Sequence, residues 1–354
     1  MSRTGATLSG SASGVAGTIV ESGFEWGLSS ASMPGTCVGN GGSSTAFTAA
    51  LSGLTKETTY YFRAYTTVQG TGEYSGTIRT FYGSVRSFIT SESQAAAGYL
   101  ELPARQSGDN LFYDNFSTEN GRNYSYCYDK GLYASLWTAY PLTYAHTQGS
   151  GHTSSWRWNP HLNQSEQVDI VSGAYEKNYG NGSYARGHLC PNADRKSDDA
   201  MNGQTFYPTN QVPQIQNGFN SGIWSNLENA IRSLTTSTDT IYVVTGPCYR
   251  KQGGNETISY LTANSGVSPA KVPVPNYFYK VLLKVERSGN TVTSASAVGF
   301  WFEHKTYSGG DYTAYAISVD QIEQWTGMDF FVNLPDNIES TAEQNTSWKS
   351  FSEF

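Results

Sequence analysis

The sequence predicts two domains of different fold class, an all-β sandwich followed by a mixed α+β domain. Its length of 354 residues exceeds what a single hydrophobic core usually organises. Aromatic residues make up 14% of the chain and 37 residues are glycine, a composition rich in strand and turn formers. Apolar residues at helical spacing stand out only in two stretches of the second half. The sequence therefore favours β structure throughout, with helices added in the second domain.

The first domain is predicted over residues 1–90. Short runs rich in Thr, Val, Tyr and Phe alternate there with Gly and Ser turns, which is typical of a β-sandwich. In the run 60–65, Tyr60, Phe62 and Ala64 share one strand face. Leu54 precedes Tyr60 at the spacing of a tyrosine corner. This segment resembles a fibronectin type III-like module, whose partner the sequence leaves unidentified.

Residues 91–105 lack a long periodic pattern and are interpreted as a linker to a second domain, 106–354. Two helices are predicted there, over 221–234 and over 318–326, the latter capped by Ser318. Strands are predicted around 136–140, 240–245, 278–284 and 295–302. Interleaved strands and helices indicate an α+β domain.

The charge balance argues against strong binding of nucleic acid by the whole surface. The net charge is −7, and residues 1–90 hold only five of the 22 basic side chains. Phosphate affinity comes from Lys and Arg, so a local basic patch would have to carry it. Arg186, Arg195, Lys196 and Arg232 are the candidates for this patch, although Arg195 and Lys196 fit solvated loop positions equally well.

No apolar run reaches the eighteen or so residues of a membrane span, and the first residues do not form a signal peptide. If the protein is secreted, periplasmic or attached to the cell surface, its export signal lies outside this sequence. The four cysteines Cys37, Cys127, Cys190 and Cys248 lack zinc-type spacing, which disfavours a zinc site around His188. A disulfide between Cys190 and Cys248, each next to a proline, is one possible pairing.

Three ordered motifs concentrate reactive side chains in the second domain. The first is Arg186-Gly-His188, and the second is Asn210-x-x-Pro-Gln214. The third is Asn220-x-Gly-x-Trp-x-x-x-Glu228-x-x-x-Arg232, in which Glu228 and Arg232 fall on one helical face. Together these motifs resemble the DNA/RNA non-specific endonuclease family of ββα-metal nucleases, from about residue 100 to 348. Most members of that family carry Asp directly before Arg-Gly-His, whereas this chain has Ala185.

The resemblance implies a ββα-metal (His-Me finger) fold with a central antiparallel sheet. It implies that His188 is the general base on a β-hairpin and that Asn220 holds the metal. Glu228, as a carboxylate, is expected to orient metal-bound water. Asp194 is the next candidate for the metal ligand if Asn220 is not. These residue types suit phosphodiester hydrolysis, because a neutral imidazole accepts a proton near neutral pH and Mg²⁺ prefers oxygen ligands. We expect Mg²⁺, with Mn²⁺ as a substitute.

The remaining motif residues are assigned to substrate and support. Arg186 and Arg232 are expected to clamp the phosphate through forked donors. Asn210 holds either the His188 loop or a phosphate oxygen. The expected activity is cleavage of DNA and RNA without sequence preference, leaving 5′-phosphate ends. The alternative is a non-catalytic surface or adhesion protein with a degenerate nuclease domain.

Overall fold

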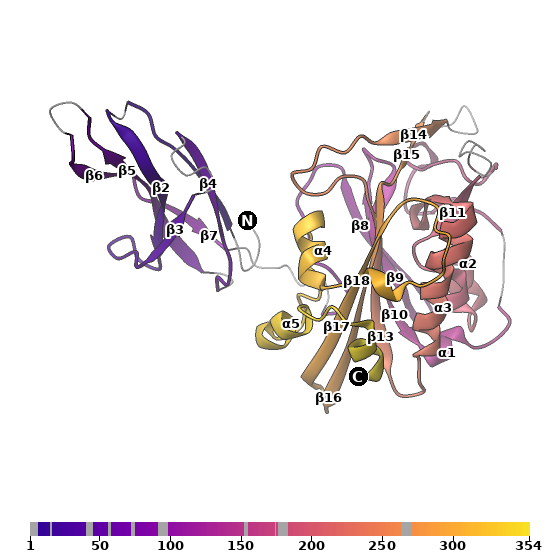
Figure 1. Cartoon of the computed structure of the whole chain (residues 1–354). Coiled ribbons are helices and arrows are strands. Elements are labelled where there is room, and N and C mark those ends of the chain that lie inside the picture. The colour runs from indigo at the N-terminus through magenta and orange to yellow at the C-terminus, as the bar shows by residue number, and fades with distance from the viewer. Residues whose placement is uncertain are drawn as a thin grey trace. The chain divides into compact units, whose positions relative to one another are not determined.

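The computed structural model describes residues 6–14, 16–39, 45–55, 58–71, 75–90, 98–151, 155–173, 175, 183–262 and 271–354. The chain divides into two compact units, Met1–Gln94 and Ala95–Phe354 (Figure 1). Each unit has its own hydrophobic core among the described residues.

The first unit is built from strands in its described part. These are β1 (Ala6–Ser11), β2 (Thr18–Gly27), β3 (Gly35–Val38), β4 (Ala46–Leu51), β5 (Thr59–Gln69), β6 (Ile78–Tyr82) and β7 (Arg86–Ile89). β1 pairs with β4, while β3, β2, β5 and β6 form a second sheet in which β7 also pairs with β5. Tyr60 is buried, and its hydroxyl accepts a hydrogen bond from the Thr55 backbone N–H at 2.9 Å. Phe62 and Ala64 pack against the same core, as the alternation along β5 predicts.

The second unit is organised around an antiparallel seven-stranded sheet. Its strands are β8 (Leu111–Thr118), β9 (Gly121–Asp129), β10 (Ala134–Thr143), β13 (Thr240–Cys248), β16 (Tyr277–Ser288), β17 (Thr291–Glu303) and β18 (Ala316–Ile317). They lie in the order β18-β17-β16-β13-β10-β9-β8. The four predicted strand regions fall in β10, β13, β16 and β17 and are confirmed.

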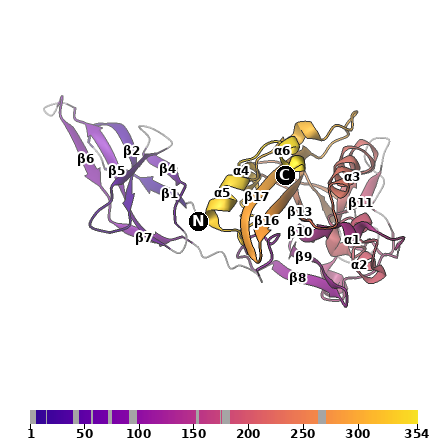
Figure 2. The ribbon, with the colours of Figure 1, turned by 90° about the horizontal axis from the view of Figure 1, so that it is seen from below.

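Different elements cover the two faces of this sheet (Figures 1 and 2). One face carries α2 (Asp199–Gln204), α3 (Ser225–Ser233) and the ribbon of β11 (Tyr184–His188) with β12 (Gln211–Ile215). The opposite face carries α4 (Val319–Thr326) and α5 (Asp336–Ala342). The other α-helices and strands described in this unit are α1 (Tyr144–Thr147), α6 (Trp348–Glu353), β14 (Ser259–Thr262) and β15 (Lys271–Val274). Each face of the sheet packs against its own hydrophobic cluster, so the sheet separates two hydrophobic cores.

The predicted helix over 318–326 is confirmed, because α4 spans Val319–Thr326 and the Ser318 hydroxyl accepts from the Gln321 backbone N–H at 3.2 Å. The helix predicted over 221–234 starts later than expected. The segment Gln216–Trp224, here called the lead-in segment, has non-helical backbone at four positions, and regular α3 begins at Ser225. Gly218 has φ +78°, a conformation that side-chain-bearing residues rarely adopt.

Residues 98–105, which the sequence assigned to a linker, belong to the second unit. Leu100 and Leu102 are buried in the core beneath the sheet. Glu101 lies between them, fully buried, and pairs with Arg122 Nη1 at 2.5 Å. The rest of the predicted linker, 91–97, lies outside the described residues. The sequence did not indicate this burial for two reasons. Two leucines on either side of one glutamate form too short a pattern, and the residues that they contact are distant in sequence.

Candidate active site

His188 lies at the end of β11, opposite Gln211 of β12. Its imidazole packs between Trp156 and Phe206, with ring centroids 5.5 and 5.0 Å away. The Nε2 atom is buried and has no hydrogen-bond partner among the described residues. Burial lowers the pKa of His188 to about 4, a hydrogen bond to the Arg186 backbone raises it, and the Arg186 charge lowers it. The imidazole is therefore neutral near neutral pH and has an unused proton acceptor.

Arg186, two residues earlier on the ribbon, is held on both sides. Its Nη1 donates to the Ile170 carbonyl at 2.8 Å, and its guanidinium carbon lies 4.0 Å from the centroid of the Trp156 ring. Trp156 thus contacts both the arginine and the histidine. A guanidinium has five N–H donors, so a fixed Arg186 still has donors for an anion beside His188.

Asn210 is fully buried beneath the ribbon. Its Oδ1 accepts from the Cys190 N–H at 2.9 Å, and its Nδ2 donates to the carbonyls of Cys190 and Thr205 at 2.9 Å. Of the two roles left open by the sequence, this geometry supports holding the loop that follows His188. Direct contact with a phosphate would require these buried hydrogen bonds to break.

Asn220 lies in the lead-in segment, which follows β12 directly and contacts both strands of the ribbon. The segment is anchored by Phe219, Ile223 and Trp224, all essentially buried. Asn220 Nδ2 donates to Gln216 Oε1 at 3.3 Å, and within the described chain nothing donates to its Oδ1. A half-buried amide oxygen that accepts no hydrogen bond from the described chain is a suitable ligand for a hard cation.

Glu228, on α3, lies among other charged groups. Burial raises its pKa to about 7, which Lys280 and Arg232 partly offset and Asp194 reinforces. Arg232 is not paired with Glu228 as the i, i+4 spacing suggested. Its Nη1 binds Asp194 Oδ1 at 2.6 Å, while Tyr140 donates to the other oxygen of Asp194 at 3.0 Å. Asp194, the alternative metal ligand in the sequence interpretation, is therefore committed to an internal ion pair.

Lys280 is a residue that sequence reasoning missed. It lies on β16, is 1% exposed, and donates from Nζ to Thr245 Oγ1 at 2.5 Å. The ammonium also lies 4.9 Å from the centroid of the Trp224 ring. Burial lowers its pKa, and the carboxylate of Glu228 raises it. A lysine inside the apolar run of a central strand was the available signal, because such a lysine needs a buried partner.

Of the two loop cations proposed for the phosphate patch, Arg195 differs from expectation. Arg195 is fully buried and donates to Asn123 Oδ1, to the Asn123 carbonyl and to the Pro141 carbonyl. Arg195 therefore neither occupies a solvated loop position nor is available to contact a phosphate. Lys196 is exposed. Of the four candidates only Arg186 and Lys196 are not tied up in a buried network or ion pair.

The suggested disulfide between Cys190 and Cys248 is absent, and all four cysteines are free thiols. Cys190 belongs to the core on the ribbon side of the sheet, whereas Cys248 belongs to the core on the α4 side. The sheet lies between them, so the thiols cannot meet. The one group of three His, Cys, Asp or Glu side chains at metal-binding distances in the described chain does not contain His188, which also removes the zinc alternative there.

The other histidines in the described part have structural partners. His304 Nε2 accepts from the Ile215 N–H at 2.9 Å, and His146 lies against the Thr143 backbone. His161 pairs with Asp114. His152 lies outside the described residues.

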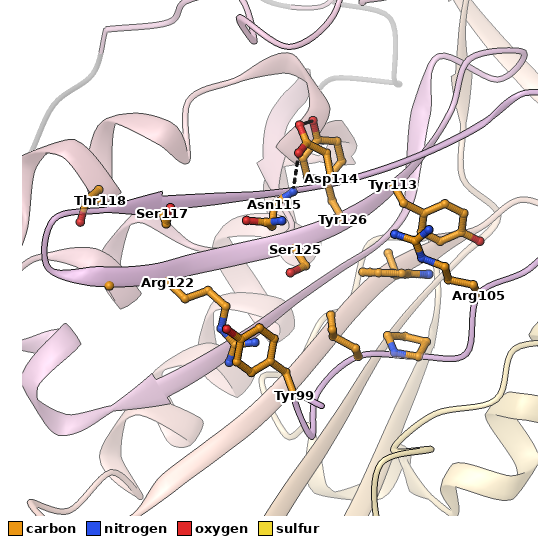
Figure 3. A pocket seen from close by; sticks show the side chains of 14 residues that line it. Tyr99, Arg105, Tyr113, Asp114, Asn115, Ser117, Thr118, Arg122, Ser125 and Tyr126 are labelled. Carbon is orange, nitrogen blue, oxygen red and sulfur yellow. Dashed lines mark hydrogen bonds between the residues drawn. The ribbon is translucent and has the colours of Figure 1, made fainter. Parts of the chain in front are cut away.

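A cavity of about 520 Å³ lies away from these residues (Figure 3). It is bounded by the 98–105 segment and by strands β8 to β10, with Arg105, Tyr113 and Arg122 in its wall. None of the six residues assigned from the motifs lines it. The cavity is therefore separate from the candidate active site.

The antiparallel ribbon and the helix that follows it carry imidazole, amide, carboxylate and guanidinium groups, which suit hydrolysis of a phosphodiester bond. The sequence profile of the DNA/RNA non-specific endonuclease family matches residues 107–337, more than half of the chain. The chain belongs to this family, whose members are metal-dependent endonucleases. No helix in the described chain has the length and apolar character needed to cross a membrane.

Individual relatives are nucleases from diverse organisms. The chain is 33% identical over 162 residues to "Nuclease 1, mitochondrial" of Schizosaccharomyces pombe, covering 44% of this chain and 49% of that protein. It is 27% identical to "Nuclease" of Nostoc sp., covering 58% and 75%, and 27% identical to "Endonuclease G, mitochondrial" of Bos taurus, covering 60% and 68%. The chain thus spans about half the length of the Schizosaccharomyces pombe relative. The solved structure "Crystal structure of the EndoG/EndoGI complex: Mechanism of EndoG inhibition" is similar with a TM-score of 0.49 and 20% identity over 66% of this chain and 89% of that one.

Proposed function

We propose that this protein is an endonuclease that hydrolyses phosphodiester bonds of DNA and RNA without reading their sequence, with His188 as general base. The observation that carries the proposal is the buried Nε2 of His188, which has no partner in the described structure although it belongs to a neutral imidazole. A buried polar atom without a partner is unfavourable, so its retention suits an atom that binds a reactant.

In this mechanism His188 takes a proton from the attacking water. As the water oxygen bonds to phosphorus, the bond from phosphorus to the 3′ oxygen breaks, that oxygen takes a proton from solvent water, and His188 then returns its own proton to solvent. The products are a 5′-phosphate and a 3′-hydroxyl. Proton transfer to a positioned base typically contributes about 10²–10⁴-fold in rate.

Asn220 Oδ1 would hold the metal, and Glu228, in the first turn of α3, would orient the water molecules around it. When bound, Mg²⁺, or Mn²⁺ in its place, supplies positive charge for the transition state and the leaving oxygen. Arg186 would hold the phosphate, positioned by Trp156 and by the Ile170 carbonyl. Arg232 would act on the site through Asp194 and Glu228. Asn210 would act by fixing the loop after His188.

The finer assignments of fold belong to the same proposal. We assign the β11, β12 and α3 unit to the ββα-metal class on the order of its elements. We assign the first unit to the fibronectin type III-like class, supported by the Thr55–Tyr60 hydrogen bond at the tyrosine-corner position. A pull-down with the full chain tests whether the first unit binds a partner. Cell fractionation tests whether the protein is exported to the periplasm, the cell surface or the medium.

The test of function is digestion of supercoiled plasmid and of a structured RNA by the full chain, with Mg²⁺ and with chelator. We expect metal-dependent cutting of both, and products that accept a ligase-dependent adaptor requiring 5′-phosphate. Absence of cleavage by a folded protein across Mg²⁺ and Mn²⁺ would favour the alternative of an adhesive protein with an inactive nuclease domain.

A further inference from the structure

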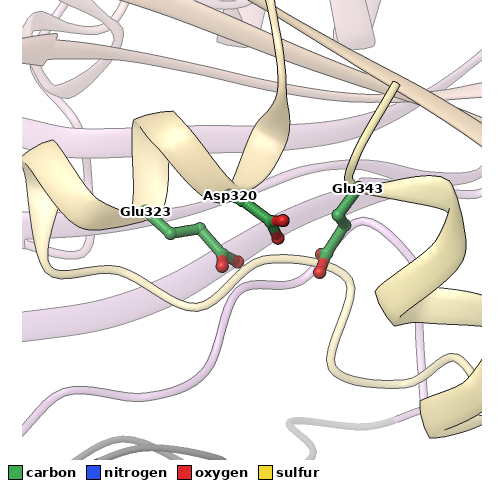
Figure 4. Close-up of side chains that lie close together, drawn as sticks. All are labelled: Asp320, Glu323 and Glu343. Carbon is green, nitrogen blue, oxygen red and sulfur yellow. The ribbon is translucent and has the colours of Figure 1, made fainter. Parts of the chain in front are cut away.

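Three carboxylates meet on the α4 side of the sheet, opposite the candidate active site (Figure 4). Asp320 and Glu323 are one helical turn apart on α4, and Glu343 directly follows α5. Each offers an oxygen atom, and these oxygens all lie within 4.8 Å of one another. Figure 4 shows the three side chains pointing toward a common space.

Glu343 is the member that most needs a partner. It is only 5% exposed, and its Oε1 is buried without a hydrogen-bond partner among the residues that the structure describes. Burying an ionised carboxylate without a partner is costly, and proteins usually pair it or bind it to a metal. Asp320 is exposed, so the space between the three side chains remains open to an ion from solvent.

The surrounding charges do not neutralise the group. The strongest charges acting on Glu343 are those of Glu323, Glu339, Asp329 and Asp320, all negative. Burial and this repulsion both disfavour the charged carboxylates of Glu323 and Glu343 in the absence of a cation. A cation would therefore relieve both burial and repulsion.

The backbone around the three carboxylates is already fixed. The Val319 N–H donates to the Glu343 carbonyl at 2.9 Å, which joins the start of α4 to the end of α5. Glu323 Oε1 accepts from the Phe330 N–H at 2.7 Å. Ile322 and Ala342 anchor the two helices in the core. The ligands are thus positioned without the ion, which lowers the entropic cost of binding one.

The chemistry of the group selects the ion. An all-oxygen set disfavours zinc and copper, which prefer nitrogen and sulfur. Ca²⁺ accepts six to eight oxygens at about 2.3–2.6 Å in flexible geometry, so oxygens on opposite sides of the ion are separated by about 4.6–5.2 Å. This is the largest separation that two oxygens bound to one Ca²⁺ can have, and the three carboxylate oxygens, all within 4.8 Å of one another, satisfy it. Mg²⁺ requires a near-ideal octahedron with shorter bonds, which a set assembled from two helices meets less readily.

We propose that Asp320, Glu323 and Glu343 bind a calcium ion that joins α4 to α5, at a site separate from the one around Asn220. The ion neutralises the buried carboxylates and stabilises the second unit. It takes no part in cleavage, since the sheet lies between the two sites.

The test uses the full-length protein after removal of metals by chelation, titrated with CaCl₂ by calorimetry and followed by thermal unfolding. The N220A variant is tested in parallel so that binding at the candidate active site does not contribute. We expect saturable binding of one Ca²⁺ by N220A, and an increase in Tm on the order of 5 °C at saturating Ca²⁺. Equimolar Mg²⁺ should give a smaller shift.

The variants Glu343→Gln and Asp320→Asn in the N220A background should lose the calcium heat and the Tm shift. Glu353→Gln, which removes a charge from the exposed end of α6, is the matched control and should retain both. Asp320 is exposed, so D320N keeps the test valid if E343Q fails to fold. Absence of calcium binding in N220A, or an unchanged Tm shift in D320N or E343Q, overturns the proposal. If N220A binds no calcium and E343Q has a higher Tm in the absence of calcium, then protons, rather than a cation, neutralise the cluster.

Discussion

His188 is the residue whose environment most constrains the chemistry, because its imidazole is neutral and its Nε2 has no described partner. We expect His188→Ala to lower the rate of plasmid cleavage by about 10²–10⁴-fold while magnesium affinity is retained. The measurement is single-turnover cleavage together with calorimetry of Mg²⁺ binding. His161→Asn is the control, since His161 is exposed and pairs with Asp114 on β8. Activity of H188A within a few-fold of wild type would remove His188 from the role of base.

Asn220 and Glu228 are expected to differ in the step that each supports. Asn220→Ala should weaken Mg²⁺ binding and shift the metal concentration needed for cleavage. Glu228→Gln should leave metal binding measurable but slow the reaction by about 10–100-fold, as expected for a group that orients bound water. The two effects are separated by measuring the cleavage rate as a function of Mg²⁺ concentration. An unchanged metal dependence in N220A would place the ligand elsewhere.

At the scale of elements, the lead-in segment depends on Gly218. A Cβ at this position would lie 2.6 Å from Thr306 Cγ2 and 2.8 Å from the Tyr307 carbonyl oxygen. Gly218→Ala should therefore lower stability by more than the roughly 1–2 kcal/mol cost of a left-handed alanine, and should weaken metal binding by displacing Asn220. Gly253→Ala is the matched control, because Gly253 has φ +73° but open space around a Cβ. Equal urea midpoints for the two variants would show that the contact with 306–307 does not matter.

A second element-scale prediction concerns the histidine that ties β12 to the sheet. His304 Nε2 accepts from the Ile215 N–H, and burial lowers the pKa of His304 to about 4. A histidine in the unfolded chain has a pKa of about 6.5, so the unfolded chain binds more protons than the folded chain between about pH 4 and 6.5. The contribution of His304 to stability is therefore fully present above about pH 6.5 and is lost as the pH falls toward 4. We expect a loss of about 1–3 kcal/mol for this group. Urea unfolding between pH 4 and 7 should show a smaller pH dependence in His304→Asn; an identical dependence would contradict the assignment.

At the scale of the whole molecule, the negative net charge limits how the protein holds nucleic acid. Arg195 is buried and Arg232 is paired, so few cations remain to contact phosphates. Each neutralised phosphate contributes a slope of about −0.9 to log affinity against log salt, so we expect a slope of about −1 to −3 for duplex DNA. Few contacts also leave little base readout, and cutting should be nearly independent of sequence. Binding of catalytically impaired H188A across a salt series tests the slope. Discrete cutting at one sequence, or an affinity that does not depend on salt concentration, would count against this account.

The sequence by itself determined the features that depend on neighbouring residues. The apolar runs of β10, β13, β16 and β17 and the Ser318 cap of α4 were predicted, because side-chain periodicity and capping act within a few residues. The ordered motifs also indicate His188, Asn220 and Glu228 as candidate site residues, since their spacing reflects one ribbon and the helix after it.

The tertiary structure alone decided which distant groups meet. The sequence could not show that Arg232 binds Asp194, that Trp156 and Phe206 enclose His188, or that Lys280 lies against Trp224, because each pair is joined only by folding of the chain. The same reason explains the errors at Arg195 and at 98–105, where charged residues that appear solvated in the sequence are buried against distant partners. Cys190 and Cys248 were kept apart by the sheet, a barrier that no local pattern records. Local propensity thus fixed the elements, and long-range packing fixed the electrostatic environment in which their side chains act.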